Sequence, residues 1–183
     1  MPNWCINDLV VSHDDPNKMD ELRKVVEKSV KNDSGADSIC SHFYPEPNYE
    51  EEEVEDAFPQ LGKPSIMPDW WNWRVVNWGT KWEESDLEVL EDEGNTMHLS
   101  FMTAWSPPRG IVQKMVEQGF STEFWYMEQG NDFWGYELDG EEIHGGCPSD
   151  FLLDGEPSKE KGLKLGISEE IWNKCALGEI RGG

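Results

Sequence analysis

The sequence predicts an α+β fold, and three features of the chain lead to it. Two strand–helix–strand patterns follow one another, an insertion rich in acids and tryptophans separates them, and a hairpin with a short helix ends the chain. Amphipathic helices and half-buried strands in this order pack as an antiparallel sheet with helices on one face. We therefore expect a ferredoxin-like, split βαβ sheet with a Trp-rich insertion and a C-terminal hairpin and helix extension.

The first pattern opens at residues 4–12, which we expect to form a strand. A helix follows, because Asp15 can cap its N-terminus and Pro16 suits its first turn. Its apolar residues recur at helical spacing: Met19, Leu22, Val25, Val26 and Val30. Residues 39–44 are predicted as the second strand, which the prolines after it would end.

The second pattern opens at residues 96–105, where apolar and more polar residues alternate strictly. This two-residue period predicts a central strand with Met97, Leu99 and Phe101 under the helices and His98 on the other face. A helix from residue 106 should then contribute Ile111, Val112 and Met115 to the same core, and end at Gly119.

Residues 120–128 are predicted as the next strand. The turn at residues 129–131 should return it as a hairpin through residues 133–138, and Asp139-Gly140 offers a further turn. A short last helix is expected from Ser168. We divide the chain into a ferredoxin-like domain at 1–138, with an acidic and Trp-rich insertion at 46–95, and a C-terminal extension at 139–183.

Charge is the most informative total of the composition. The 183 residues include 38 acids and 15 bases, a net charge of −23. Such a surface repels nucleic-acid phosphates and anionic membranes, so we expect neither as a direct partner. The chain has no apolar run of the ~18–20 residues that cross a bilayer, and its first residues lack signal-peptide features. Cytoplasmic residence is the expectation.

Catalytic motifs are missing from the sequence: it has no GxSxG, P-loop or GxGxxG pattern. His144 and Cys147 could supply two metal ligands, but two more would be needed, and the glycines between them are typical of a loop. The four cysteines (Cys5, Cys40, Cys147, Cys175) form no CxxC pair, and we expect small buried residues. The sequence therefore predicts no enzyme, no metal and no cofactor.

Four ordered blocks carry a resemblance to a known family. They are the opening Met-Pro-Asn-Trp-Cys-Ile-Asn-Asp-Leu, Pro45-Glu46-Pro47, Asn77-Trp78-Gly79-Thr80-Lys81-Trp82, and Thr103-Ala104-Trp105-Ser106-Pro107-Pro108. Together they resemble the YubB-type family of uncharacterised phage and plasmid proteins with a predicted ferredoxin-like domain. The resemblance spans most of the chain up to the predicted hairpin. It implies a mobile-element origin and this fold, and it implies no reaction.

Clustered acids are the first candidate site. Residues 46–56 and 83–93 each hold seven acids and no base. Such arrays are usually solvated surface, but they can also imitate nucleic-acid phosphates and occupy the basic groove of another protein. The candidate partner-binding residues are Glu50, Glu51, Glu52, Glu53, Glu55, Asp56, Glu83, Glu84, Asp86, Glu88, Glu91, Asp92 and Glu93.

The tryptophan-rich segment is the second candidate site. On a helix, Trp70, Arg74 and Trp78 would line up four residues apart. Interleaved rings and cations can stack a nucleotide and hold its phosphate, or the rings can plug the open face of the sheet. The alternative ligand groove consists of Trp70, Trp73, Arg74, Trp78, Lys81 and Trp82.

These features lead to a first functional hypothesis, which rests on the clustered acidic residues. We expect a non-enzymatic accessory protein of a phage or plasmid that binds, and inhibits, a basic or nucleic-acid-binding host defence protein through its acidic surfaces. The alternative is a small-molecule or nucleotide-binding module that uses the Trp-rich groove.

Overall fold

The computed structural model describes residues 3–31, 37–51, 67–128 and 130–146, together with residues 152, 153, 156, 157, 160, 163 and 169. Its elements are β1 (Trp4–Ser12), α1 (Pro16–Lys31), α2 (Ile39–Phe43), α3 (Asp69–Asn77), β2 (Ser85–Glu93), β3 (Thr96–Ala104), α4 (Arg109–Glu117), β4 (Ser121–Glu128), β5 (Phe133–Leu138), β6 (Glu141–Gly146), β7 (Leu152–Leu153) and β8 (Glu156–Pro157).

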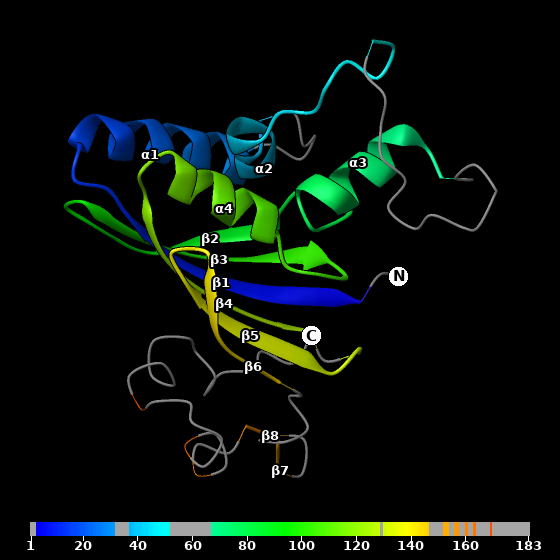
Figure 1. Ribbon diagram of the computed structural model, residues 1–183. Coiled ribbons are helices and arrows are strands. Elements are labelled where there is room, and N and C mark those ends of the chain that lie inside the picture. Colours follow the sequence, from blue (N-terminus) through cyan, green and yellow to red (C-terminus); the bar gives the residue numbers. More distant parts are fainter. Residues whose placement is uncertain are drawn as a thin grey trace.

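Six strands form one antiparallel sheet in the order β2-β3-β1-β4-β5-β6. The first four follow the βαββαβ order of a split βαβ fold, in which each helix crosses from one strand to the next but one. Helices α1, α2 and α4 cover one face, and α3 lies beyond one end of the sheet (Figure 1). The α+β class and the ferredoxin-like topology are confirmed.

The core lies between the sheet and its helices. Met97, Leu99 and Phe101 of β3 are at most 5% exposed, and they belong to one apolar cluster with Leu22, Val26, Ile111, Val112 and Met115. Val25 is partly buried against this cluster. The strict alternation in residues 96–105 therefore gave the correct register, because a one-residue slip would have moved every apolar side chain to the other face.

The predicted second strand at residues 39–44 is wrong, because these residues form α2. Ser38 caps this short helix by accepting the Ser41 amide at 2.9 Å, and the Glu84 carboxylate accepts the amides of Ile39 and Cys40. These contacts satisfy donors that a helix start leaves without partners.

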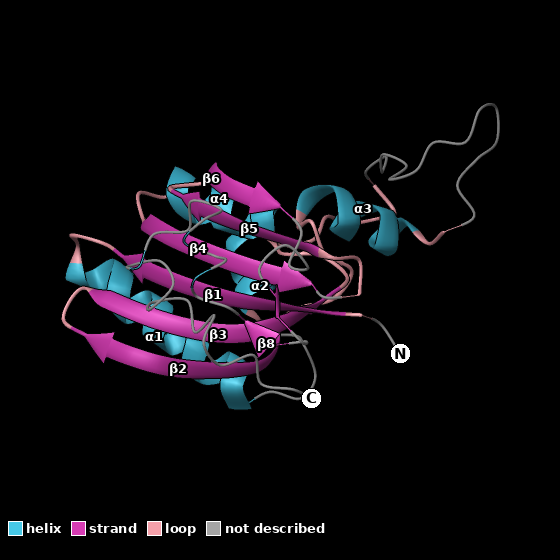
Figure 2. Ribbon diagram, turned by 90° about the horizontal axis from the view of Figure 1, so that it is seen from below, coloured by secondary structure: helices cyan, strands magenta, loops and turns pink. Residues whose placement is uncertain are grey.

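The strand that completes the sheet at this edge is β2, which lies within the predicted 46–95 insertion. Two register shifts interrupt its pairing with β3, one between Ser85 and Glu88 and one between Val89 and Glu91. Its acids hide the two-residue period that would have predicted a strand. Figure 2 shows β2 at one edge of the sheet and β6 at the other.

Both predicted turns after β4 are confirmed. Glu128 pairs with Phe133 across the β4–β5 turn, and Leu138 pairs with Glu141 across Asp139-Gly140. Asp139 and Gly140 have φ of 47° and 77°, as a two-residue hairpin turn requires. The β5–β6 hairpin thereby continues the sheet into the predicted extension. The helix expected from Ser168 falls almost wholly outside the described residues.

In the described part of the chain, no helix is long and apolar enough to cross a membrane.

Replacing Phe101 with alanine should lower the free energy of unfolding by ~3–5 kcal/mol, because it removes a buried aromatic side chain from the centre of the core. Urea denaturation measures the change. Met102→Ala, on the same strand but facing away from the helices and only partly buried, is the control and should cost much less. Equal midpoints for Phe101→Ala and the parent would contradict the observed register.

Candidate functional site

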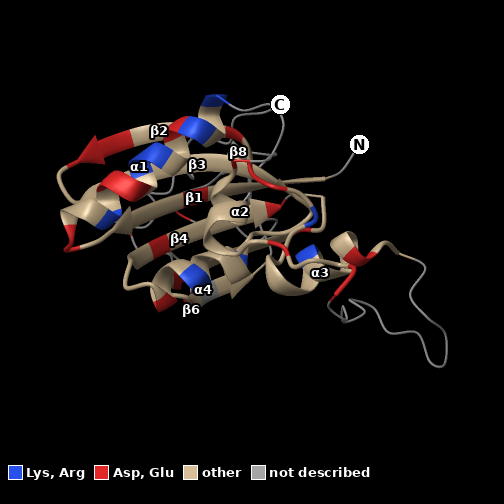
Figure 3. Ribbon diagram, turned by 90° about the horizontal axis from the view of Figure 1, so that it is seen from above, with Lys and Arg blue, Asp and Glu red and all other residues tan. Residues whose placement is uncertain are grey.

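Charge is divided between the sheet and the helices. None of the six strands of the described sheet contains a Lys or Arg. The described bases lie in α1, α3 and α4 and, for Lys81, in the loop before β2, as Figure 3 shows from the helix side. The acids of the strands are Asp8, Asp86, Glu88, Glu91, Asp92, Glu93, Glu123, Glu128, Glu137, Glu141 and Glu142. The sheet is therefore the negative layer of the described fold.

The second acidic run divides between the two faces of β2. Glu88, Glu91 and Glu93 pair with Ser100, His98 and Thr96, on the face away from the helices. Residues opposite one another in an antiparallel pair project on the same side, so these three exposed carboxylates line the sheet face that the helices leave uncovered. Their side chains form the acidic edge, a name kept for Glu88, Glu91 and Glu93 below.

Three other acids of this run hold the fold together. Glu84 caps α2 and also accepts the Ser29 hydroxyl of α1 at 2.7 Å. Glu83 pairs with Arg74 at 2.8 Å. Asp92 pairs with Arg23 of α1 at 2.9 Å, on the helix side of β2. A run of acids in a sequence does not distinguish such roles from solvated surface.

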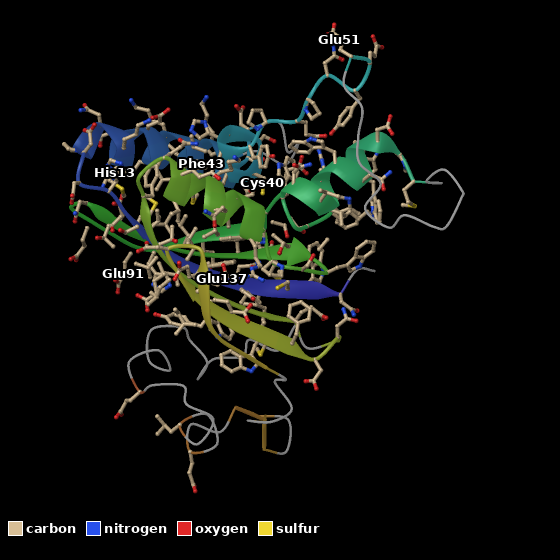
Figure 4. The ribbon with its side chains drawn as sticks, viewed as in Figure 1. His13, Cys40, Phe43, Glu51, Glu91 and Glu137 are labelled. Carbon is tan, nitrogen blue, oxygen red and sulfur yellow. The ribbon has the colours of Figure 1, made fainter. Side chains whose placement is uncertain are left out.

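The first acidic run is only partly described. Glu50 and Glu51 are exposed, and Figure 4 shows Glu51 on a loop that stands away from the body of the protein. Glu46, at the start of the run, pairs with Arg74 and accepts the Tyr49 hydroxyl. The remaining predicted residues lie outside the described part of the chain: Glu52, Glu53, Glu55 and Asp56.

The predicted line of Trp70, Arg74 and Trp78 is present on α3. The Arg74 guanidinium lies 5.4 Å from the Trp70 ring centre and 4.6 Å from that of Trp78. Trp78 is fully buried in the helix-side core, so it does not cover the open face of the sheet. Glu46 and Glu83 already pair with the Arg74 guanidinium, so this cation has a structural role: it links α3 to the two segments that carry these carboxylates.

The other residues of the predicted groove separate into two places. Trp73 packs edge-on against Tyr44 and Trp78, with ring centres 5.1 and 5.8 Å apart. Lys81 instead lies between Trp82 and Trp105, at 4.4 and 4.8 Å from their ring centres. The structure thus brings Lys81 and Trp82 together with a ring that sequence reasoning left out of the groove.

A buried His–Asp pair also lies on the open face of the sheet. The His98 Nε2 is 3.0 Å from the Asp8 Oδ1, and the two side chains are 14% and 6% exposed. Sequence reasoning placed His98 on this face but missed Asp8, whose position inside an apolar strand was the available signal. The pair satisfies two polar groups that would be costly to bury alone.

A second buried carboxylate lies on the helix side of β5. Glu137 is 1% exposed and pairs with Arg109 at the start of α4, while Glu142 of β6 lies 3.4 Å from the same guanidinium. Burial raises the pKa of the Glu137 carboxyl above its ordinary value, and Arg109 only partly offsets this. Burial likewise raises the pKa of the nearby Tyr126 hydroxyl.

Thiol and metal chemistry find little support in the described residues. Cys5 and Cys40 are buried, and burial raises the pKa of both thiols far above the usual range, which makes them poor nucleophiles. No group of three His, Cys, Asp or Glu positioned to hold a metal occurs among those residues. Cys147 and Cys175, and the side chain of His144, lie outside what the structure describes.

Topology and site thus define a ferredoxin-like α+β protein with an acidic sheet. Residues 77–150 match the model of a family described as the ferredoxin-like domain in Api92-like protein. The crystal structure of a protein Api92 from Yersinia pseudotuberculosis is similar, with a TM-score of 0.46 and 9% identity over 80% of this chain and 98% of that one. No curated protein matches. The family match supports the ferredoxin-like assignment. The comparisons name neither the YubB-type family nor a phage or plasmid.

Replacing Glu84 with alanine should destabilise the protein by about 2–3 kcal/mol, because three donors on α1 and α2 lose a charged acceptor. Glu91→Ala, which removes an exposed acid of the same acidic run from β2, should change stability by less than about 0.5 kcal/mol. Chemical denaturation of the two variants compares them. Equal losses would mean that the division between structural and surface acids is wrong.

The free energy of unfolding of the Glu137→Gln variant should increase relative to that of the parent as pH rises. A carboxyl whose pKa is raised by folding stabilises the protein below its unfolded value, near 4.5, and this stabilisation is lost as pH rises through the folded pKa. Glutamine does not ionise, so it escapes that loss. The difference in unfolding free energy between pH 4 and 8 measures the effect, with Glu141→Gln of the adjoining strand as the control. A difference that shrinks with pH would show that the Arg109 ion pair outweighs burial.

Proposed function

We propose that this protein is a non-enzymatic interaction protein that binds a basic, nucleic-acid-binding protein through its acidic sheet. The single observation that carries the proposal is the division of charge: the strands hold acids without a Lys or Arg, while the bases of the described chain lie in the helices and in one loop. Exposed acids of the strands, with no Lys or Arg among them, give a basic partner a complementary surface.

The acidic edge is the centre of the proposed contact. Glu88, Glu91 and Glu93 are exposed on a face that no described helix covers. Glu91 and Glu93 are two residues apart, which places them ~6.8 Å from one another along the strand, and Glu88 extends the row beyond the irregularity between Val89 and Glu91. Such a row supports the hypothesis of phosphate imitation. The exposed acids Glu50 and Glu51 supply a second negative surface on the loop before α3.

The biological setting belongs to the same proposal. The resemblance of four sequence blocks to the YubB-type family supports an accessory protein of a phage or plasmid that acts in the cytoplasm of its host. Mobile elements gain by blocking nucleic-acid-binding defence proteins, and occupying the basic groove of such a protein would inhibit it.

Affinity capture from a bacterial extract tests the contact. The parent chain should enrich a basic or nucleic-acid-binding protein, and a variant with Glu88→Gln, Glu91→Gln and Glu93→Gln should capture it at least about tenfold less. The matched control removes the same charge from the helix face, with Glu21→Gln, Glu27→Gln and Glu117→Gln, and should capture normally. Raising the salt should weaken the parent's capture, because salt screens exposed charges.

Competition with nucleic acid then tests the imitation itself. If the carboxylates occupy a nucleic-acid groove, duplex DNA or RNA should release the captured partner. Enrichment of no basic or nucleic-acid-binding protein, or equal capture by the acidic-edge and control variants, would overturn the proposal. If nucleic acid does not displace the captured partner, the proposed interaction stands and the hypothesis of nucleic-acid imitation is excluded.

A further inference from the structure

Trp105 has a backbone conformation that its side chain does not favour. Its φ is 71°, in the left-handed region, where a bulky residue is a rare outlier. The indole is nevertheless 39% exposed, so packing in the core does not explain why a tryptophan stands there. Strained residues of this kind persist where the surrounding structure holds them, and they concentrate at binding sites.

Several hydrogen bonds hold the Trp105 loop. The Trp105 amide donates to the Asn3 carbonyl at 2.9 Å, and Thr103 donates its hydroxyl to the Ser106 carbonyl at 2.8 Å. Thr80 donates to the Ala104 carbonyl at 3.0 Å, which ties the loop to the segment that carries Lys81 and Trp82. These hydrogen bonds hold the backbone from which the Trp105 ring projects beside Lys81.

Three tryptophans and one lysine meet at this end of the sheet. The Trp4 and Trp82 ring centres are 6.3 Å apart, and the Lys81 ammonium lies between Trp82 and Trp105. Trp4 is 38% exposed. We name Trp4, Trp82, Trp105 and Lys81 the indole platform.

The ammonium of the platform has no acidic partner among the described residues. Lys81 forms no ion pair with any carboxylate of the described residues, although the chain has 38 acids and 15 bases. Arg74, seven residues earlier in the predicted groove, differs from Lys81 because two carboxylates pair with it. A cation between the half-buried Trp82 ring and the exposed Trp105 ring, with no described carboxylate beside it, suits a ligand that brings both a flat ring and a negative charge.

We infer that the indole platform binds a mononucleotide, with the base stacked on an exposed indole and the phosphate paired with the Lys81 ammonium. Base–indole stacking and cation–phosphate contacts are the usual elements of such sites. A single nucleotide fits this protein better than a strand, because a strand would carry further phosphates along the acidic sheet. The site is separate from the acidic edge, and neither proposal depends on the other.

Titration of 15N-labelled protein, observed at the indole N–H resonances, tests the platform. The chain has ten tryptophans and therefore ten indole N–H resonances. The three of the platform are assigned with the single variants Trp4→Phe, Trp82→Phe and Trp105→Phe. AMP, GMP, CMP or UMP should shift them saturably at millimolar concentration, adenosine should bind more weakly, and inorganic phosphate should give no saturable shift. Shifts confined to Trp70, Trp73 and Trp78, or no shift with any of the four nucleotides, would overturn the proposal.

Two variants separate binding from folding. Trp105→Gly suits the positive φ, so its melting temperature should equal or exceed the parent's, yet its affinity for AMP should fall at least about fivefold because the stacking face is gone. Lys81→Gln should lower the affinity for AMP at least about fivefold and leave the affinity for adenosine unchanged.

Lys114→Gln is the matched control, because Lys114 also lies over a ring, that of Tyr44, but pairs with Glu117. It should bind AMP as the parent does. Equal AMP affinity in the Lys81→Gln and Lys114→Gln variants would exclude a phosphate contact at Lys81. A site that responds to a single-stranded oligonucleotide and to no mononucleotide would replace this inference with strand binding.

Discussion

The position of Trp78 is the constraint on which the arrangement of the insertion depends. Its indole N–H donates to the Tyr44 carbonyl at 2.7 Å, and its own carbonyl accepts the Gly110 amide at the start of α4. The approach is so close that a Cβ at Gly110 would meet the Asn77 carbonyl oxygen at 1.7 Å. One fully buried residue thereby joins the end of α3 to α2 and α4, and the chain leaves this joint towards Lys81 and Trp82.

Beyond this joint, the fold sorts charge by layer. The helices carry the bases on their outer surfaces, where long side chains remain in water, and the strands carry acids alone. Two acids that turn towards the helices meet bases there: Asp92 pairs with Arg23, and Glu137 pairs with Arg109. On the opposite face of the strands, Asp8 contacts His98, and Glu88, Glu91 and Glu93 are exposed. In the described part of the chain, Lys and Arg are thus kept out of the sheet, and the exposed acids of its strands form a surface without these bases.

Regular periods in the sequence predicted the fold where one face of an element is buried. The alternation of residues 96–105 and the helical spacing of Leu22 and Val26 follow directly from that burial, and the structure confirms both. Residues 39–44 are too short to show a period, and their helix is set by Glu84, which is distant in sequence. For the candidate sites, helical spacing predicted the stacking of Arg74 on its neighbours, whereas Trp105 and Asp8 joined their clusters through tertiary contacts that spacing does not reveal.

The outer edge of the sheet at β2 has a consequence for how the protein behaves in concentrated solution. An edge strand offers unpaired amides and carbonyls to any neighbouring chain, and Val89 and Leu90 are exposed here by 44% and 41%. Repulsion between the carboxylates of two such edges, together with the two irregularities in pairing, opposes edge-to-edge pairing of two copies. Salt screens that repulsion while leaving the apolar pair in place, so the route to self-association through this strand opens as the ionic strength rises.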